Sequence, residues 1–224
     1  MAALAEALEG KAPEEILAAA AARFPRIAFA TGFGAEGCLI VDAIAAARAP
    51  VDVFTLDTGF LFAQTYALWT ELEARYGLTI RGVKGADAPA LIPGQPPPWE
   101  RDPDACCEAR KVRPLRAALT GLDAWVTAIR RDQTPDRAGA QVVEWDERFG
   151  LVKVNPLVAW THDQVWARLR ERQVPTNPLH AEGYASIGCA PCTTPVAPGE
   201  DPRAGRWRGR EKTECGLHRK DTRP

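Results

Sequence analysis

The sequence has no long hydrophobic segment and no strong excess of charge of either sign. None of its apolar runs approaches the roughly 18–20 residues that cross a bilayer. Near the start, Glu6, Glu9 and Lys11 interrupt what would be the apolar part of a secretory signal, and no basic segment precedes it. The net charge of −1 argues against a surface that binds nucleic acids generally. We therefore expect a cytoplasmic protein with neither a membrane nor a nucleic acid as partner.

The chain is long enough for one sizeable hydrophobic core. It has 224 residues, 46% of them hydrophobic, which suits a single α/β domain better than two complete ones. We find no internal repeat. The predicted organisation is one domain over residues 1–200, followed by a mobile tail over residues 201–224. A homo-oligomer is compatible with the sequence, but no feature of it specifies an oligomeric state.

Strand-like and helix-like segments alternate along the chain. Strands are expected at 26–30, 51–56, 78–83 and 122–129, helices within 1–22, at 38–44, at 61–76, from 106 and from 161, and a hairpin at 141–154. This order predicts a mostly parallel, twisted sheet flanked by helices, with right-handed crossovers. The prolines between 89 and 98 predict an extended surface loop over 85–105 that is neither helix nor central strand.

A glycine-rich turn follows the first predicted strand and precedes a helix. Such a turn aims backbone N–H groups and the positive end of the helix at an anion. It lacks the Gly-Lys-Ser/Thr of a Walker loop, and a tight turn with a purely structural role would explain it equally well. The candidate phosphate-binding residues are Thr31, Gly32, Phe33, Gly34, Ala35 and Glu36.

The second predicted strand also ends in polar residues. Ligands of parallel α/β sheets bind at the carboxyl ends of strands, so this end is a plausible edge of the same pocket. The simpler alternative is that a side chain here caps the next helix. The residues concerned are Leu56, Asp57, Thr58 and Gly59.

Four of the six cysteines form two pairs. In a cytoplasmic protein they are expected as reduced thiols, metal ligands or catalysts rather than as disulfides. Cys189 and Cys192 lie among Pro and Gly residues, which favours a metal half-site over a thioredoxin-type pair. The adjacent Cys106 and Cys107 supply the other half. Four thiolates suit a zinc ion or a 4Fe–4S cluster, and adjacent ligands, seldom found in tetrahedral zinc sites, favour the cluster.

The other two cysteines have different settings. Cys38 lies on an apolar helix and is expected to be a buried free thiol. Cys215 lies in a polar tail with little core to pack against, and basic residues precede it, which favours the reactive thiolate. The same basic run predicts a small or local anionic partner. Lys111 follows Cys107 by four residues, so on a helix both lie on one face.

Five separated segments match a single family in order. They are Gly32-Phe33-Gly34-Ala35-Glu36; Leu56-Asp57-Thr58-Gly59 with Leu61-Phe62; Cys106-Cys107 with Arg110-Lys111-Val112; Arg130 with Gln133-Thr134 and Arg137; and the run from Tyr184 to Glu214-Cys215-Gly216-Leu217-His218. In these segments the chain resembles the assimilatory sulfonucleotide reductases, specifically the iron–sulfur adenylylsulfate (APS) reductases. The resemblance implies an adenine nucleotide α-hydrolase-like fold with a modified phosphate-binding loop.

The resemblance also implies a reaction. The Cys215 thiolate would attack the sulfur of APS, expel AMP and leave a thiosulfonate, from which thioredoxin or a similar dithiol releases sulfite. Because an anion then attacks an anion, cations must surround the sulfate. The family positions of these groups are Lys111, Arg203, Arg206 and His218.

The remaining roles also follow from the resemblance. The turn at 31–36 and the strand end at 56–59 would cradle the nucleotide, with Arg130 and Arg137 at the same pocket. The four paired cysteines would hold a 4Fe–4S cluster that organises the site through Lys111 and passes no electrons to the substrate. The sequence departs from the family pattern at Thr31, Gly37 and Gln64, where Ser, an acidic residue and Glu are common.

Three alternatives stay open. A reductase for 3′-phosphoadenylylsulfate (PAPS), or for both nucleotides, is the nearest, although the cluster-free PAPS branch lacks both cysteine pairs. A PP-loop enzyme that modifies tRNA would need an ATP-type Ser-Gly-Gly-x-Asp-Ser loop, which is missing. A zinc-stabilised protein could contact RNA through the run from Arg206 to Arg210.

Overall fold

A six-stranded sheet in the order β3-β2-β1-β4-β6-β5 forms the centre of the computed structural model, which describes residues 1–212 and 214–217. All neighbouring strands are parallel except β5 and β6, which pair antiparallel as the predicted hairpin. The mostly parallel sheet is thereby confirmed. The strands are β1 (Ile27–Thr31), β2 (Asp52–Leu56), β3 (Ile80–Val83), β4 (Ala124–Val126), β5 (Val143–Asp146) and β6 (Leu151–Val154).

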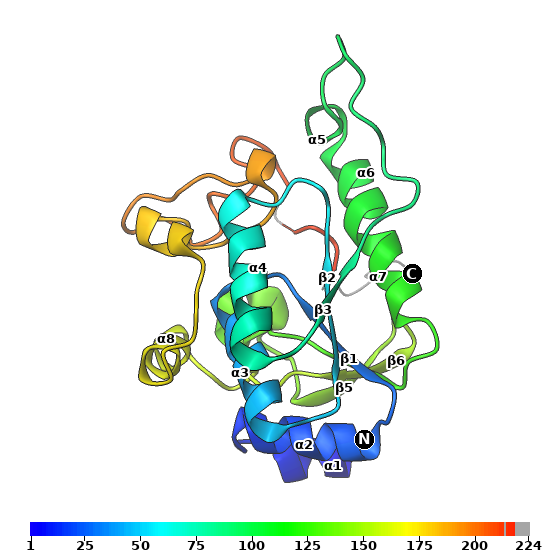
Figure 1. The fold of residues 1–224 in the computed structure, drawn as a ribbon, viewed down its shortest axis with the longest axis vertical. Coiled ribbons are helices and arrows are strands. Elements are labelled where there is room, and N and C mark those ends of the chain that lie inside the picture. Colours follow the sequence, from blue (N-terminus) through cyan, green and yellow to red (C-terminus); the bar gives the residue numbers. More distant parts are fainter. Residues whose placement is uncertain (213, 218–224) are drawn as a thin grey trace.

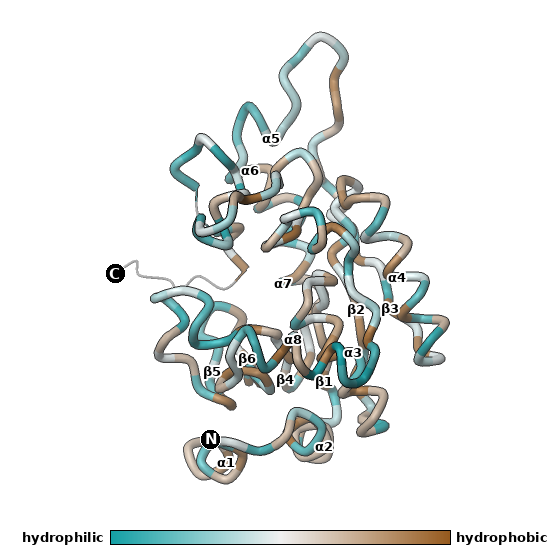
Figure 2. Tube along the Cα trace, turned by 90° about the vertical axis from the view of Figure 1, so that its left-hand side faces the viewer, coloured by the Kyte–Doolittle hydropathy of each residue, from teal (hydrophilic) through white to brown (hydrophobic). Residues whose placement is uncertain are grey.

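Both faces of the central strands β1, β4 and β6 are buried, and these strands are mostly apolar, whereas the edge strands β3 and β5 also carry exposed residues. Alternate residues face opposite sides: Phe29 belongs to the larger core cluster, and its neighbour Ala28 to the smaller one. In Figure 2 the brown of hydrophobic residues recurs along the strands and along the helices beside them. The larger cluster includes residues of α2 (Pro13–Arg23), α3 (Ala35–Ala47), α4 (Ala63–Tyr76) and α8 (His162–Glu171), and the smaller one residues of α7 (Arg113–Leu119).

Several helices begin at residues that carry a local start signal in the sequence. The two predicted N-terminal helices are α1 (Ala2–Leu8) and α2, and α2 begins with a proline followed by two glutamates. Thr161 caps α8, the helix expected from residue 161: its hydroxyl accepts a hydrogen bond from the Gln164 N–H at 3.2 Å, and the Gln164 side chain accepts one from the Thr161 N–H at 2.8 Å.

The prediction of an extended loop over 85–105 is wrong at its end. Two short helices, α5 (Pro98–Arg101) and α6 (Pro103–Cys107), each begin with a proline, because the missing N–H costs no hydrogen bond at a first helical position. A turn of π-helix, η1 (Glu108–Val112), then joins α6 to α7 in one continuous rod. The preceding loop projects from the top of the molecule in Figure 1.

The chain after α8 carries 3-10 turns, η4 (Pro178–Glu182) and η5 (Ala190–Cys192), and no longer helix in its described part. In Figure 1 this segment, coloured yellow to red, passes over the end of the sheet where α4 begins. Leu217 packs against the smaller core cluster. The mobility of the tail stays a prediction. Within residues 1–212 and 214–217, no helix is long and apolar enough to cross a membrane.

Candidate active site

The glycine-rich turn lies between the end of β1 and the start of α3, for which Gly34 is the cap residue. Thr31 stabilises the turn, since its hydroxyl accepts a hydrogen bond from the Phe33 N–H at 3.1 Å. A Cβ on Gly37 would lie 2.9 Å from this hydroxyl, so the absence of a side chain there makes room for Thr31. Phe33 is fully buried and stacks on Trp69 at 5.7 Å, so its side chain belongs to the core and not to a ligand surface.

The polar end of β2 is held by its own contacts. Asp57 accepts hydrogen bonds from the Tyr66 hydroxyl at 2.6 Å and the Gly59 N–H at 3.0 Å, and it pairs with Lys84 at 3.2 Å. Burial raises the pKa of Asp57, but these three contacts outweigh burial and leave it below its usual value. The idea that this stretch caps the next helix is wrong, because Phe62 is the cap residue of α4.

All four paired cysteines line one small pocket. Cys106 and Cys107 lie on α6, and Cys189 and Cys192 lie at the ends of η5. The Thr58 hydroxyl lies 3.3 Å from the Cys189 sulfur, so the strand end borders this pocket. The other residues that line it are Phe60, Trp99, Pro103, Arg110, Lys111, Pro191 and Trp207.

The pocket also contains buried polar groups without a partner among the described residues. Among the described residues, no three His, Cys, Asp or Glu side chains form a group that could hold one metal ion. Two buried N–H donors that belong to lining residues, Arg110 Nε and Trp207 Nε1, have no hydrogen-bond partner within the described part of the chain. Unpaired buried donors are costly, so they call for an acceptor other than the described residues.

Burial and charge act differently on the four thiols. Burial, only partly offset by Lys111, raises the pKa of Cys107 to about 11. Burial also raises the pKa values of Cys106 and Cys192. For Cys189, burial is outweighed by Lys111, Thr58 and Arg206, which together lower its pKa.

Lys111 is a buried cation between the cysteine pocket and the tail. Its residue is only 9% exposed and lies in the π-helical turn. Burial lowers the pKa of Lys111, but its charge interactions with the sulfurs of Cys189, Cys215 and Cys107 leave it above its usual value. The ammonium is therefore held in its charged form, close enough to Cys215 for their charges to interact.

The tail brings Cys215 to this group of charges. Cys215 is partly buried, and the residue before it, Glu214, pairs with Arg137 at 3.2 Å and Arg203 at 3.0 Å. Arg206 lies over the Trp207 ring at 4.5 Å. Burial lowers the pKa of Arg206, and the negative charge of Cys215 partly offsets this, so the two also interact.

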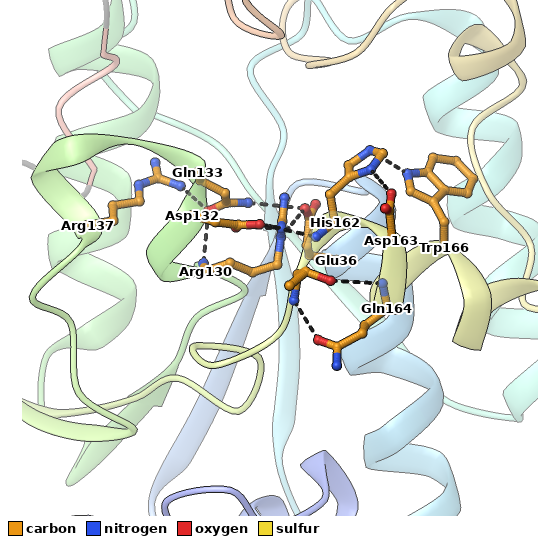
Figure 3. A network of polar contacts seen from close by, with 10 residues as sticks. Glu36, Arg130, Asp132, Gln133, Arg137, His162, Asp163, Gln164 and Trp166 are labelled. Atoms are coloured by element: carbon orange, nitrogen blue, oxygen red, sulfur yellow. Dashed lines mark hydrogen bonds and ion pairs between the residues drawn. The ribbon is translucent and has the colours of Figure 1, made fainter.

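The predicted nucleotide contacts Glu36 and Arg130 bind each other. The Arg130 guanidinium lies 2.9 Å from Glu36 and 2.5 Å from Asp132. Gln133 joins them to the tail, since its amide donates to Glu36 at 3.2 Å and its oxygen accepts from Arg137 at 2.5 Å. Figure 3 shows Arg130 and Gln133 converging on Glu36.

Sequence reasoning placed most of these groups but not all. The structure brings together both cysteine pairs, Lys111, Arg206 and Cys215, and it places the turn at 31–36 next to Arg130. His218 lies outside the described residues. Three residues outside the predicted set take part in the arrangement: Gln133, Trp207 and Glu214. Each lies in a segment of the family pattern, which is the one signal that could have found it.

Comparison with known proteins identifies the family of this chain. The model of the phosphoadenosine phosphosulfate reductase domain matches residues 26–195. The chain belongs to the phosphoadenosine phosphosulfate reductase family. It is thus an oxidoreductase, and the resemblance noted in its sequence is confirmed.

Curated members of this family carry two names. A phosphoadenosine 5'-phosphosulfate reductase of Gloeobacter violaceus is 46% identical, over 96% of this chain and 92% of that protein. An adenosine 5'-phosphosulfate reductase of Halalkalibacterium halodurans is 44% identical, over 86% of this chain and 85% of that protein. The family alone therefore leaves the choice between the two nucleotides to experiment.

Solved structures agree on the fold of this family member. The phosphate complex of the phosphoadenylyl-sulfate (PAPS) reductase of Candida auris has a TM-score of 0.76 and 32% identity, and the match covers 85% of this chain and 94% of that one. An FMN adenylyltransferase of Candida glabrata, with a TM-score of 0.61 and 15% identity, shares the fold alone. The predicted adenine nucleotide α-hydrolase-like fold is confirmed.

Proposed function

We propose that the protein reduces APS to sulfite and AMP, with electrons from thioredoxin or a similar dithiol, in assimilatory sulfate reduction. The observation that carries this proposal is that Cys215 lies close enough to Lys111, which lines the cysteine pocket, and to Arg206 for their charges to interact. Relatives named adenosine 5'-phosphosulfate reductase support the same reaction.

Cys215 is the proposed nucleophile. Its thiolate attacks the sulfur of APS, an S–S bond forms, the S–O bond to the phosphate breaks, and AMP leaves with the bonding electrons. One thiol of the donor then attacks the Cys215 sulfur and releases sulfite. The second donor thiol resolves the mixed disulfide, which returns the Cys215 thiol and leaves the donor oxidised by two electrons.

The cations of the site oppose the repulsion between thiolate and sulfate. We assign this role to Lys111 and Arg206, because both interact with the charge of Cys215, and because Lys111 is buried and Arg206 half-buried, where charge is less screened than in water. We also assign Arg137, Arg203 and His218 to binding of the anionic substrate APS. The turn at 31–36, the strand end at 56–59 and Arg130 are assigned to the nucleotide.

We further propose that Cys106, Cys107, Cys189 and Cys192 hold a 4Fe–4S cluster. Their common pocket supports this, since a cluster is larger than an ion and its ligands stand further apart. The unpaired buried donors of Arg110 and Trp207 fit it as well, because sulfur accepts hydrogen bonds. When bound, the cluster adds a fixed charge next to Lys111 and carries no electrons to the substrate.

A reductase for PAPS, or for both nucleotides, is the second candidate. The Gloeobacter violaceus relative that bears the name of a PAPS reductase favours it. The RNA-binding alternative loses its main support, because the basic run contacts the body of the protein. Arg208 pairs with Glu200 at 3.0 Å, and Lys212 pairs with Asp104.

The test is mass spectrometry of the tail peptide after the protein, purified without oxygen, has been incubated with APS alone or with PAPS alone. We expect a sulfite adduct on Cys215 with APS. The matched control, Cys215→Ser, should keep the visible absorbance of the cluster and form no adduct. A large preference for PAPS would establish the second candidate, and an adduct on another cysteine would contradict the assignment of the nucleophile.

A further inference from the structure

Glu214 lies next to the proposed nucleophile and bridges two arginines. One carboxylate oxygen accepts from Arg137 at 3.2 Å, and the other pairs with Arg203 at 3.0 Å. The Glu214 side chain is 12% exposed and that of Arg137 is 11% exposed. A carboxylate shared by two guanidiniums in a poorly solvated place is a directional contact, unlike an ordinary surface ion pair.

The arginine pair needs this anion. Burial lowers the pKa of Arg137, the charge of Arg203 lowers it further, and Glu214 acts in the opposite direction. Two cations that repel each other in a buried place are stabilised by a carboxylate between them. The bridge therefore draws the tail toward Arg137, which does not belong to the tail.

Arg137 is itself fixed in place. It donates to the Gln133 oxygen, and the Gln133 amide donates to Glu36 at the start of α3. The bonded path from Glu36 through Gln133 to Arg137 is visible in Figure 3. Through Arg137 and Gln133, Glu214 thus connects the tail next to the nucleophile to the first turn of α3, a helix packed on the sheet.

The tail is also held on either side of Glu214. Lys212 pairs with Asp104 at the start of α6, and Leu217 packs on the smaller core cluster. Neither contact is adjacent to Cys215 in sequence, whereas Glu214 is. The residue directly before the thiol is therefore held by the arginine bridge.

We propose that Glu214 is a positioning residue, whose bridge between Arg137 and Arg203 holds Cys215 within reach of the charges of Lys111 and Arg206. The catalytic purpose of this positioning rests on the proposed function. Its structural part, that the bridge limits access to Cys215, stands independently of any substrate.

The first test uses the cluster-bearing protein without substrate. Cys215 is alkylated with neutral iodoacetamide across a range of pH, and the tail peptide is followed by mass spectrometry. In Glu214→Gln we expect the plateau rate at high pH to rise about tenfold, the effect of losing one charge-assisted hydrogen bond. The plateau rate of Glu214→Asp should lie between those of the unchanged protein and Glu214→Gln. A change in the ionisation of Cys215 would move only the midpoint of the plot of rate against pH. The plateau rate therefore reports how accessible the Cys215 sulfur is.

The matched control is Glu211→Gln. Glu211 lies on the same tail, is exposed, and has no ion pair with any described residue. In Glu211→Gln, Cys215 should be alkylated at the same rate as in the unchanged protein. Equal acceleration in both variants, or a shift of the midpoint without a higher plateau in Glu214→Gln, would overturn the proposal.

The second test measures a single turnover with APS. Glu214→Gln should slow formation of the sulfite adduct about tenfold and leave the affinity for AMP nearly unchanged, since the variant displaces the nucleophile. An unchanged rate of adduct formation would overturn the positioning role. If the unchanged protein forms no adduct while Glu214→Gln still gains the higher alkylation plateau, the bridge is supported and the proposed function fails.

Discussion

Single residues at this site have functions that depend on unusual surroundings. Lys111 is the clearest case, because an ammonium that is 9% exposed stays charged only where anions face it. The groups that raise its pKa are the sulfurs of Cys189 and Cys215, which come from two different parts of the chain. Lys111 is therefore a shared counter-ion, and its removal should affect chemistry more than folding.

Replacing Lys111 tests this role. In Lys111→Ala we expect a folded protein that binds its cluster but turns over about a hundredfold more slowly, as for other lost electrostatic contacts to a reacting group. Sulfite release under saturating APS measures the effect, and visible absorbance reports the cluster. Lys11→Ala, a change at an exposed lysine outside the site, is the control. Near-normal turnover in Lys111→Ala would remove this residue from the mechanism.

Asp57 should make stability depend on pH. Its folded pKa lies below the ordinary value of 3.8, so the carboxylate stabilises the fold above that pH, and the contribution is lost as pH falls through the folded pKa. Asp57→Asn should cost about 1–2 kcal/mol at pH 7, from hydrogen bonds to a charged group. Urea unfolding at a series of pH values should show the gap to the unchanged protein closing below about pH 4. A gap of constant size would contradict the prediction.

At the scale of elements, the regular parts of the fold follow from local patterns, and the contacts between elements do not. The apolar strand at 51–56 and the capping box at Thr161 are recognisable because their signals lie within a few residues. Proline is ambiguous by comparison, since Pro98 and Pro103 start helices where the sequence suggested a loop. The π-helical turn has no distinctive composition, so no sequence pattern predicted it.

The same distinction applies to the site. Cysteines are rare and chemically specific, so their pairing by function could be argued from spacing alone. Glutamate and glutamine are common on surfaces, and their partners depend on the folded arrangement. Glu214 and Gln133 therefore gained roles only once Arg137 could be placed between them.

The close approach of Gly85 to the π-helical turn gives a prediction for this element. A Cβ on Gly85 would lie 2.2 Å from the Ala109 carbonyl oxygen, a backbone atom that must shift to admit it. We expect Gly85→Ala to destabilise the protein by about 1–3 kcal/mol and to lower turnover as well, because Ala109 lies between Cys107 and Lys111. Gly139→Ala, where a Cβ meets open space, is the matched control. Urea unfolding and sulfite release measure the two effects, and equal stability of both variants would contradict the steric argument.

At the scale of the whole molecule, the protein consists of a sheet with an apolar core and a C-terminal segment laid over one end of that sheet. The core clusters that enclose the strands contain none of the four paired cysteines. The C-terminal segment meets the rest through isolated contacts such as the bridge between Leu61 and Cys189 and the hydrogen bond from the Ala190 N–H to the Phe60 carbonyl at 2.7 Å. The proposed cluster would join this segment to α6.

Removing the cluster should therefore loosen one part of the molecule and leave the other intact. After chelation of the iron without oxygen, we expect faster amide hydrogen exchange over residues 185–212 and unchanged protection in β1, β2 and β4, because buried apolar contacts hold the strands and short turns hold the segment. Cys189→Ser should reproduce this pattern. Cys38→Ala, a change at a buried thiol outside the pocket, should keep both the cluster and the protection of residues 185–212. Loss of protection in the strands on removal of the iron would show instead that the cluster stabilises the whole fold, since the core would then depend on ligands that lie outside it.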